Sequence, residues 1–269
     1  MANIYNNPQL YDAIHKNISS DKEMITHYAK KCNGSVLELA SGTGRLAKHI
    51  IDLDLPYTGI DTSKTFIKEA KKRFGNKGIF QTGNMQDFNL QTDYNFIFIG
   101  FNSFLHNLTD KDAENCLSSV YKHLSKNGIF FVSAFIPDPI FLYQGESLHP
   151  ATSYFNYKSR RCRIMEQNTY DENTLINSIT WSIECDGLLS GETYTFKQRM
   201  YYPHMMDILL NENGFLIKEK YGGWDRSPLD EDSPLQIYIC RKIWLLFYST
   251  SALPDGGMAE KVSAVNFLC

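Results

Sequence analysis

The stretch that decides the fold is "VLELASGTGRLAKHI", residues 36–50. It begins as a mostly apolar strand, passes through a turn with two glycines, and continues with Leu46, Ala47 and Ile50 at helical spacing. The pattern predicts a strand that enters a helix through a loop whose backbone a ligand can approach. Free N–H groups at the start of a helix favour anionic groups, so this turn is suited to bind a pyrophosphate or a carboxylate.

Two cofactors are compatible with the turn. The spacing Gly42-x-Gly44-x-x-Ala47 satisfies the dinucleotide fingerprint when alanine is allowed in the third place. It also suits S-adenosylmethionine, because an acidic residue, Glu38, ends the strand ahead of the glycines. The turn alone leaves open both cofactors and a third alternative, a tight strand-to-helix connection without a ligand.

Strand and helix patterns alternate from about residue 35 to residue 135. One predicted helix has an apolar stripe and ends at Gly75. Another begins after Thr109, which forms a capping box with Asp112. Parallel neighbouring strands need a crossover, which is usually a helix. The alternation therefore predicts an α/β fold with a doubly wound, mostly parallel, seven-stranded sheet. The first five strands are expected at 35–40, 57–61, 78–82, 94–101 and 128–135.

The pattern changes after Pro137. Residues of about 154–202 alternate between apolar and polar side chains and are joined by turn sequences, which predicts an antiparallel β insert after the fifth strand. The α/β pattern resumes with a helix from Pro203 and strands at 215–221 and 235–242. We expect an N-terminal helical lid segment at 1–33, a main domain at 34–242 with its insert at about 145–202, and a C-terminal tail at 243–269 that is partly disordered.

Composition limits the partners. The 269 residues carry a net charge of −3, which provides no general attraction for nucleic acid or anionic lipid. The first residues lack the basic and apolar regions of a signal peptide, and no apolar stretch is long enough to span a bilayer. We expect a soluble, cytoplasmic protein without a bound metal. No C-x-x-C pair occurs, and we interpret each cysteine as a small apolar core residue: Cys32, Cys116, Cys162, Cys185, Cys240 and Cys269.

Two further segments follow the first turn at the spacing expected for a nucleoside site. Asp61 ends the second strand, where a carboxylate can accept hydrogen bonds from both ribose hydroxyls. Residues 83–88, "GNMQDF", follow the third strand as a polar turn that can contact an adenine edge. The alternative role for Asp61 is a simple cap of the following helix.

With these features the sequence resembles the class I S-adenosylmethionine-dependent methyltransferases over most of residues 34–242. The family signature is E-x-G-x-G-x-G, and this chain reads from Glu38 to Gly44 with Ala40 in the first glycine place. Alanine is tolerated there if its φ angle is negative, whereas Gly42 and Gly44 stand where the ligand approaches closely. The resemblance implies S-adenosylmethionine as cofactor.

The resemblance also implies which residues bind the cofactor. Asn84 stands where family members more often have aspartate, and its amide oxygen can still face the exocyclic amine of adenine. The order of the segments is similar to the small-molecule branch, which implies a monomer or homodimer that methylates a nitrogen or oxygen of a small polar metabolite. The implied cofactor-binding residues are Tyr11, Glu38, Ala40, Gly42, Gly44, Asp61, Thr62, Asn84, Met85, Gln86, Gly100 and Phe101.

Candidate residues for the methyl acceptor are fewer. His106 follows the fourth strand at the ligand-binding edge of the predicted sheet and is the candidate catalytic base, with a structural histidine as the alternative. Tyr5 and Tyr11 precede the first strand, in a segment that covers the cofactor in similar enzymes. The basic run Lys158, Arg160, Arg161 and Arg163 suits an anionic substrate or a solvated hairpin face.

Two other functions stay open. A nicotinamide-dependent oxidoreductase would leave Glu38, the 83–88 turn and the insert without a role. Methylation of RNA or protein is the other alternative. Residues 100–103 lack the Asp/Asn-Pro-Pro-Tyr/Phe box with which enzymes that methylate base amines hold a flipped base, so a nucleic-acid substrate is disfavoured.

Overall fold

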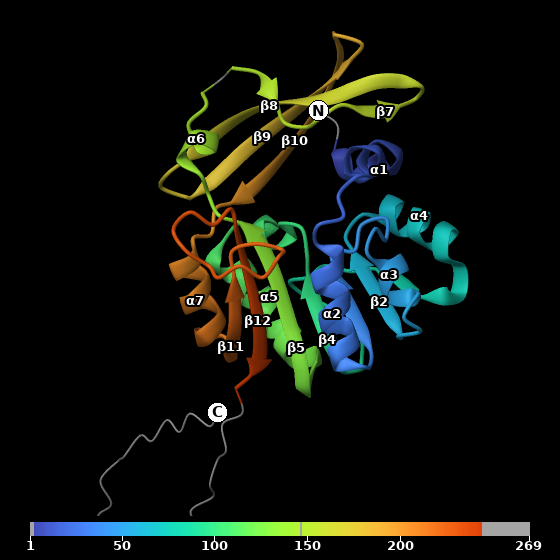
Figure 1. Ribbon diagram of the computed structural model, residues 1–269, viewed down its shortest axis with the longest axis vertical. Coiled ribbons are helices and arrows are strands. Elements are labelled where there is room, and N and C mark those ends of the chain that lie inside the picture. The colour runs from blue at the N-terminus through green and yellow to red at the C-terminus, as the bar shows by residue number, and fades with distance from the viewer. Residues whose placement is uncertain (1–2, 146, 244–269) are drawn as a thin grey trace, which may run out of the picture.

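The computed structural model describes residues 3–145 and 147–243. Within these residues the main sheet has seven strands, and Figure 1 shows it below a second, antiparallel sheet. Strand β12 runs antiparallel to both β5 and β11, and the other neighbours are parallel. The predicted fold is confirmed. The strand order is β11 (Phe215–Tyr221), β12 (Leu235–Lys242), β5 (Leu124–Phe135), β4 (Tyr94–Ile99), β1 (Val36–Leu39), β2 (Tyr57–Asp61) and β3 (Ile79–Thr82).

Helices cover both faces of the main sheet, and an apolar cluster fills the space on each side. Strand β4 is apolar from Phe96 to Ile99 because both of its faces are buried: Phe96 and Phe98 belong to one cluster, and Ile97 and Ile99 belong to the other. One cluster includes residues of α2 (Lys22–Cys32), α3 (Ala47–Ile51) and α4 (Lys64–Phe74). The other includes residues of α5 (Asp110–His123) and α7 (Pro203–Glu212). The predicted capping box of Thr109 and Asp112 starts α5.

The predicted antiparallel insert is confirmed as a second sheet. It begins slightly earlier than the alternating pattern indicated, because a short strand precedes residue 154. Its strand order is β10 (Leu188–Arg199), β9 (Ile176–Cys185), β8 (Arg160–Asp171) and β6 (His149–Pro150), and β7 (Phe155–Tyr157) also pairs with β8. The short helix α6 (Pro139–Leu142) leads into this sheet, which lies beyond the carboxyl ends of the parallel strands (Figure 1).

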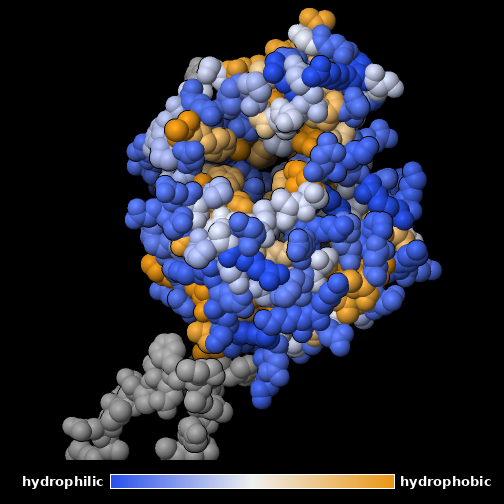
Figure 2. Space-filling model, in the orientation of Figure 1, coloured by the Kyte–Doolittle hydropathy of each residue, from blue (hydrophilic) through white to orange (hydrophobic). Residues whose placement is uncertain are grey.

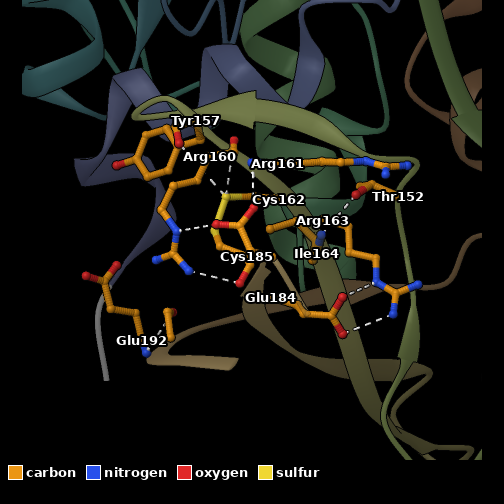
Figure 3. Close-up of a disulfide and its surroundings, with 12 residues drawn as sticks. Thr152, Tyr157, Arg160, Arg161, Cys162, Arg163, Ile164, Glu184, Cys185 and Glu192 are labelled. Carbon is orange, nitrogen blue, oxygen red and sulfur yellow. Dashed lines mark hydrogen bonds and ion pairs between the residues drawn. A yellow bond between two sulfur atoms is a disulfide. The ribbon is translucent and has the colours of Figure 1, made fainter. Parts of the chain in front are cut away.

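The interpretation of all cysteines as unpaired core residues is wrong for two of them. Cys162 and Cys185 face each other on β8 and β9 and form a disulfide (Figure 3). The pairing of the two strands brings them together across 23 residues of sequence. Cys116 and Cys240 are buried and unpaired, as expected, whereas Cys269 lies outside the described residues.

The N-terminal segment packs against the second sheet. It consists of η1 (Ile4–Asn6) and α1 (Pro8–His15), followed by α2. Ile4 and Leu10 are buried in an apolar cluster with the disulfide.

Two other short 3-10 turns are η2 (Gly75–Lys77) and η3 (Ser103–His106). The predicted partly disordered tail, from residue 244 onward, lies outside the described residues. No helix in the described part of the chain is long and apolar enough to cross a membrane.

Candidate active site

A cavity of about 770 Å³ lies between the two sheets. Its floor comes from the segments that follow β1, β2, β3 and β4, and its roof comes from the inner face of the second sheet. Residues of η1 and α1 line it as well. Figure 2 shows the molecule hollowed between these two parts on the face drawn. Open α/β sheets bind ligands at this carboxyl edge, and the volume is typical of small-molecule sites.

The glycine turn is built from residues with left-handed backbone. Gly42 has a φ of +58° and lines the cavity, and Gly44 has a φ of +83° but does not line it. A Cβ atom on Gly44 would lie 2.6 Å from the ring of Phe74, so this glycine is required by packing. The expected negative φ at Ala40 is wrong, because the turn holds this residue at +57°. Ala40 still lines the cavity, in a backbone conformation that glycine adopts more easily.

Asp61 connects the end of β2 to the glycine turn. One carboxylate oxygen accepts the N–H of Gly42 and the other accepts the N–H of Ser63, both at 2.8 Å. The cap of α4 is Ser63, whose hydroxyl accepts the N–H of Phe66, so Asp61 is not the cap of that helix. Burial raises the pKa of Asp61, and the two backbone N–H groups oppose this shift. The carboxylate lines the cavity together with Thr62.

Glu38 lies behind the turn and does not line the cavity. Its carboxyl accepts a hydrogen bond from the hydroxyl of Tyr57 on β2. Burial raises the pKa of Glu38 to about 8, although the bond from Tyr57 and the charge of Arg45 act in the opposite direction. In the structure Glu38 therefore links β1 to β2 from beneath the site.

The polar turn after β3 forms the next part of the floor. Asn84, Met85 and Gln86 all line the cavity. The side-chain oxygen of Asn84 accepts the N–H of Gln86 at 3.1 Å, and the Gln86 amide donates to Asn107 at 3.2 Å. These bonds hold the turn in place and leave its polar groups beside Asp61, where a nucleoside would need donors and acceptors.

The segment after β4 is conformationally strained. Phe101 and Asn102 have φ angles of +52° and +63°, which non-glycine residues rarely adopt in succession. Asn102 accepts the N–H of Phe135 at 2.8 Å, and the guanidinium of Arg45 lies 5.1 Å from the Phe101 ring. These contacts stabilise the turn. Phe101 lines the cavity, whereas Gly100 does not.

His106 lies on η3 and is half-buried. Its Nδ1 is 3.1 Å from the carbonyl of Lys197, which can only accept, so Nδ1 carries the proton. Burial lowers the pKa of His106, and the neutral ring leaves Nε2 as an acceptor. The hydroxyl of Tyr5 donates to Nε2 at 2.9 Å. His106 is thus a neutral imidazole that lines the cavity, and its Nε2 is covered by Tyr5.

Aromatic rings from three parts of the chain meet at Tyr5. Its ring lies 6.0 Å from Phe66, 6.2 Å from Tyr11 and 6.4 Å from Phe196, measured between centroids. Tyr11 stacks against His15 at 4.1 Å. Burial raises the pKa of both tyrosines, so their hydroxyls stay protonated. The N-terminal segment therefore covers the cavity with apolar ring surface.

The second sheet contributes residues that the sequence analysis did not select. Glu166, Trp181, Phe196 and Gln198 line the roof of the cavity. Glu166 lies on the inward face of β8, at the same period of two as the buried Ile164, so a polar residue at an inward position was the available signal.

The basic run that suits an anionic substrate or a solvated hairpin face lies outside the cavity. Arg160 pairs with Asp186 and Arg163 pairs with Glu184, and Arg161 stacks on Tyr154 at 4.0 Å. None of the three arginines, nor Lys158, lines the cavity. The hairpin-face alternative is the one that the structure favours.

Comparisons with known proteins identify the fold and indicate a methyltransferase domain within it. A family model described as "Methyltransferase domain" matches residues 36–128. An uncharacterized methyltransferase of Geobacillus sp. (strain WCH70) is 28% identical over 119 residues, which are 44% of this chain and 55% of that protein. Residues 36–128 thus resemble a methyltransferase domain, in agreement with the resemblance of the sequence to the class I S-adenosylmethionine-dependent methyltransferases. The matched region thus spans about half the length of this curated relative.

Solved methyltransferases have the same fold. The CcbJ methyltransferase from Streptomyces caelestis has a TM-score of 0.76 and 19% identity, covering 89% of this chain and 98% of its own. An S-adenosylmethionine-dependent methyltransferase from Clostridium acetobutylicum ATCC 824 has a TM-score of 0.74 and 16% identity, covering 90% and 100%. CalS10 of Micromonospora echinaspora, an amino pentose methyltransferase with bound S-adenosylmethionine, has a TM-score of 0.66 and 12% identity, covering 87% and 97%.

Of the two cofactors that the glycine turn left open, S-adenosylmethionine is the one that the methyltransferase-domain match and the solved S-adenosylmethionine-dependent neighbours favour. Most of the residues expected at the cofactor meet in this cavity, whereas Glu38, Gly44 and Gly100 lie behind or beside it. Those lining the cavity are Tyr11, Ala40, Gly42, Asp61, Thr62, Asn84, Met85, Gln86 and Phe101, together with the candidate base His106. No cluster of metal-ligating side chains occurs among residues 3–145 and 147–243.

Proposed function

We propose that the protein transfers the methyl group of S-adenosylmethionine to a nitrogen or oxygen atom of a small polar molecule. The observation that carries the proposal is the composition of one cavity. A carboxylate and a glycine turn lie on its floor, and a neutral histidine lies under an aromatic cover. CalS10, which shares the fold, is described as an amino pentose methyltransferase, and this supports a small acceptor.

The floor of the cavity fits the cofactor. The carboxylate of Asp61 suits a ribose diol, and Asn84 and Gln86 offer amide groups to an adenine edge. At Gly42 a Cβ atom would lie 3.9 Å from both Phe66 and Tyr11, so this position adjoins the rings that cover the cavity. We assign the nucleoside to this floor and the methionine end to the segment at Phe101.

When bound, S-adenosylmethionine supplies an electrophilic methyl group, so the chain's own contribution is positioning and exclusion of water. Tyr5, Tyr11 and Phe66 provide the apolar cover. His106 holds its Nδ1 proton on the Lys197 carbonyl, so its unprotonated Nε2, which accepts the Tyr5 hydroxyl in this structure, is the atom that would take a proton from an amine or hydroxyl acceptor. Tyr5 must move from Nε2 to admit the acceptor, which couples the cover to the base.

A comparison of ligands tests the cofactor. S-adenosylhomocysteine at a hundredfold excess over its Kd should stabilise the folded protein by about 2.7 kcal/mol. For a chain of this size the melting temperature should rise by about 5 to 10 °C. NAD and NADP at the same concentration should leave it unchanged. A shift with either dinucleotide and none with S-adenosylhomocysteine would overturn the proposal.

A further inference from the structure

The charge of the cavity is one-sided. Its lining, within the described residues, contains two carboxylates, Asp61 and Glu166, and neither lysine nor arginine. Asp61 belongs to the floor, where its carboxylate accepts a hydrogen bond from the N–H of Gly42. Glu166 belongs to β8 in the roof and is the acidic residue on the acceptor side. A ligand with an anionic group would meet no lysine or arginine there, whereas a cationic ligand would meet a carboxylate.

Glu166 is only partly satisfied by the protein. It is 6% exposed, and its Oε2 accepts the indole N–H of Trp181 at 2.6 Å. Its Oε1 lies 3.7 Å from Nε2 of His149, which is within ion-pair distance when that histidine is protonated but beyond hydrogen-bond distance. Burial raises the pKa of Glu166, and the Trp181 bond and His149 oppose this. A buried carboxylate in this state gains stability when a cation reaches it.

Aromatic surface connects Glu166 to the candidate base. Trp181 lies edge-on to Phe196, with 5.0 Å between ring centroids, and Phe196 lies 6.3 Å from the ring of His106. The roof therefore presents aromatic rings next to a carboxylate, which is the combination that binds an ammonium group attached to an apolar body.

We infer that Glu166 binds a positively charged nitrogen of the methyl acceptor, so that the substrate class is a cationic amine without an anionic group. The inference rests on the proposed function, because it concerns the acceptor end of the same cavity. Glu166 sets specificity here, and His106 keeps the role of base. The competing explanation is that Glu166 only orients Trp181.

One substitution separates the two explanations. Glu166→Gln keeps an oxygen that can accept the Trp181 N–H, so a purely orienting role survives it, but it removes the charge. Glu172→Gln is the matched control, since Glu172 lies exposed in the turn between β8 and β9 and is absent from the cavity lining. The probes are benzylammonium and benzyl alcohol, which share a ring and differ in charge.

The experiment starts by titrating S-adenosylhomocysteine into each protein by calorimetry. Failure of the wild type to bind it would count against the proposed function, separately from the role of Glu166. Each probe is then titrated into the protein saturated with S-adenosylhomocysteine, and the indole N–H signal of Trp181 is followed by NMR. The chain has three tryptophans, so Trp181→Phe identifies that signal.

We expect wild type and Glu172→Gln to bind benzylammonium at least tenfold more tightly than benzyl alcohol, with a shift of the Trp181 signal. Glu166→Gln should lose this preference while its S-adenosylhomocysteine affinity stays within about twofold. The inference is overturned if the wild type binds the two probes equally or not at all, or if Glu166→Gln keeps the preference for the cation.

Discussion

The floor and the roof of the cavity differ in how they are built. The floor consists of turns that follow parallel strands, and each functional group lies within a few residues of a strand end, as Asp61 does at the end of β2. The roof consists of side chains in the middle of antiparallel strands, such as Glu166 on β8 and Trp181 on β9. The floor depends on local backbone conformation, whereas the roof depends on strand pairing.

This difference assigns separate tasks to the two walls. The floor is fixed by hydrogen bonds between backbone and side chain, such as that from Gly42 to Asp61, which suits an invariant cofactor. The roof can change its side chains without disturbing that backbone, which suits a variable acceptor. Changes to one wall should therefore leave the ligand of the other wall largely unaffected.

The largest expected effect on the roof comes from the disulfide that lies behind it. Cys162 and Cys185 close a loop of 23 residues, and losing a crosslink of that span costs about 3 kcal/mol of unfolding free energy. Denaturant curves with and without a thiol-free phosphine reductant should show this loss. The Cys162→Ala/Cys185→Ala variant should match the reduced protein and no longer respond to the reductant.

The affinity for S-adenosylhomocysteine at low denaturant should stay within about threefold in the reduced protein, because the cofactor floor contains neither cysteine. Cys116 serves as the control: it is buried and unpaired, so Cys116→Ala should not change the response to reductant. Equal stability of oxidised and reduced protein would contradict the expected contribution of the crosslink.

Asp61→Asn should give the largest effect on the floor. Loss of charge-assisted bonds to two ribose hydroxyls is expected to weaken S-adenosylhomocysteine binding by about 1.5 to 3 kcal/mol, or roughly ten- to a hundredfold. Because both oxygens of Asp61 already accept backbone N–H groups, the variant should also lose about 1 kcal/mol of stability. Titration calorimetry and a denaturant curve measure the two effects.

Asp93→Asn is the control for charge, because Asp93 is exposed and does not line the cavity. It should bind the ligand like the wild type. If Asp61→Asn also bound with unchanged affinity, or if its affinity fell only in proportion to the unfolded fraction, Asp61 would not contact the cofactor.

The helices and strands and the residues of the cavity floor could be predicted from the sequence better than the residues of the roof. Gly42 and Asp61 could be predicted from the sequence because neighbouring residues indicate where a turn lies and where a strand ends. Whether Cys162 pairs with Cys185 is set by the register of β8 on β9, which no local pattern records. The φ of Ala40 was also hidden, because the turn imposes a left-handed conformation that alanine does not indicate.

The third effect is a pH dependence beneath the floor. The pKa of Glu38 is raised by burial to about 8, so between its ordinary value and pH 8 the folded protein holds a proton that the unfolded chain has lost. The stability contributed by this group is present at low pH and is lost as pH rises, at about 1.4 kcal/mol per pH unit. Above pH 8 the free energy of unfolding should no longer change through the ionisation of Glu38.

Denaturant curves of wild type and Glu38→Gln from pH 5 to 9 isolate this contribution, since the difference between the two proteins removes the other titrating groups. The difference should change steadily with pH and become constant above pH 8. A difference independent of pH would show that Glu38 is ionised in the folded protein.

The smallest effect concerns Ala40, and its sign is the informative part. A non-glycine residue in the left-handed region costs about 1 to 2 kcal/mol, whereas glycine loses about 0.4 to 1 kcal/mol more in chain entropy on folding. Because Ala40 has a φ of +57°, Ala40→Gly should stabilise the protein by up to about 1 kcal/mol. The control Ala13→Gly lies within α1 and should destabilise it by about 0.5 to 1 kcal/mol. Chemical denaturation of both variants decides the matter: a loss of stability in Ala40→Gly as large as that in Ala13→Gly would show that the turn does not hold this residue in the left-handed conformation.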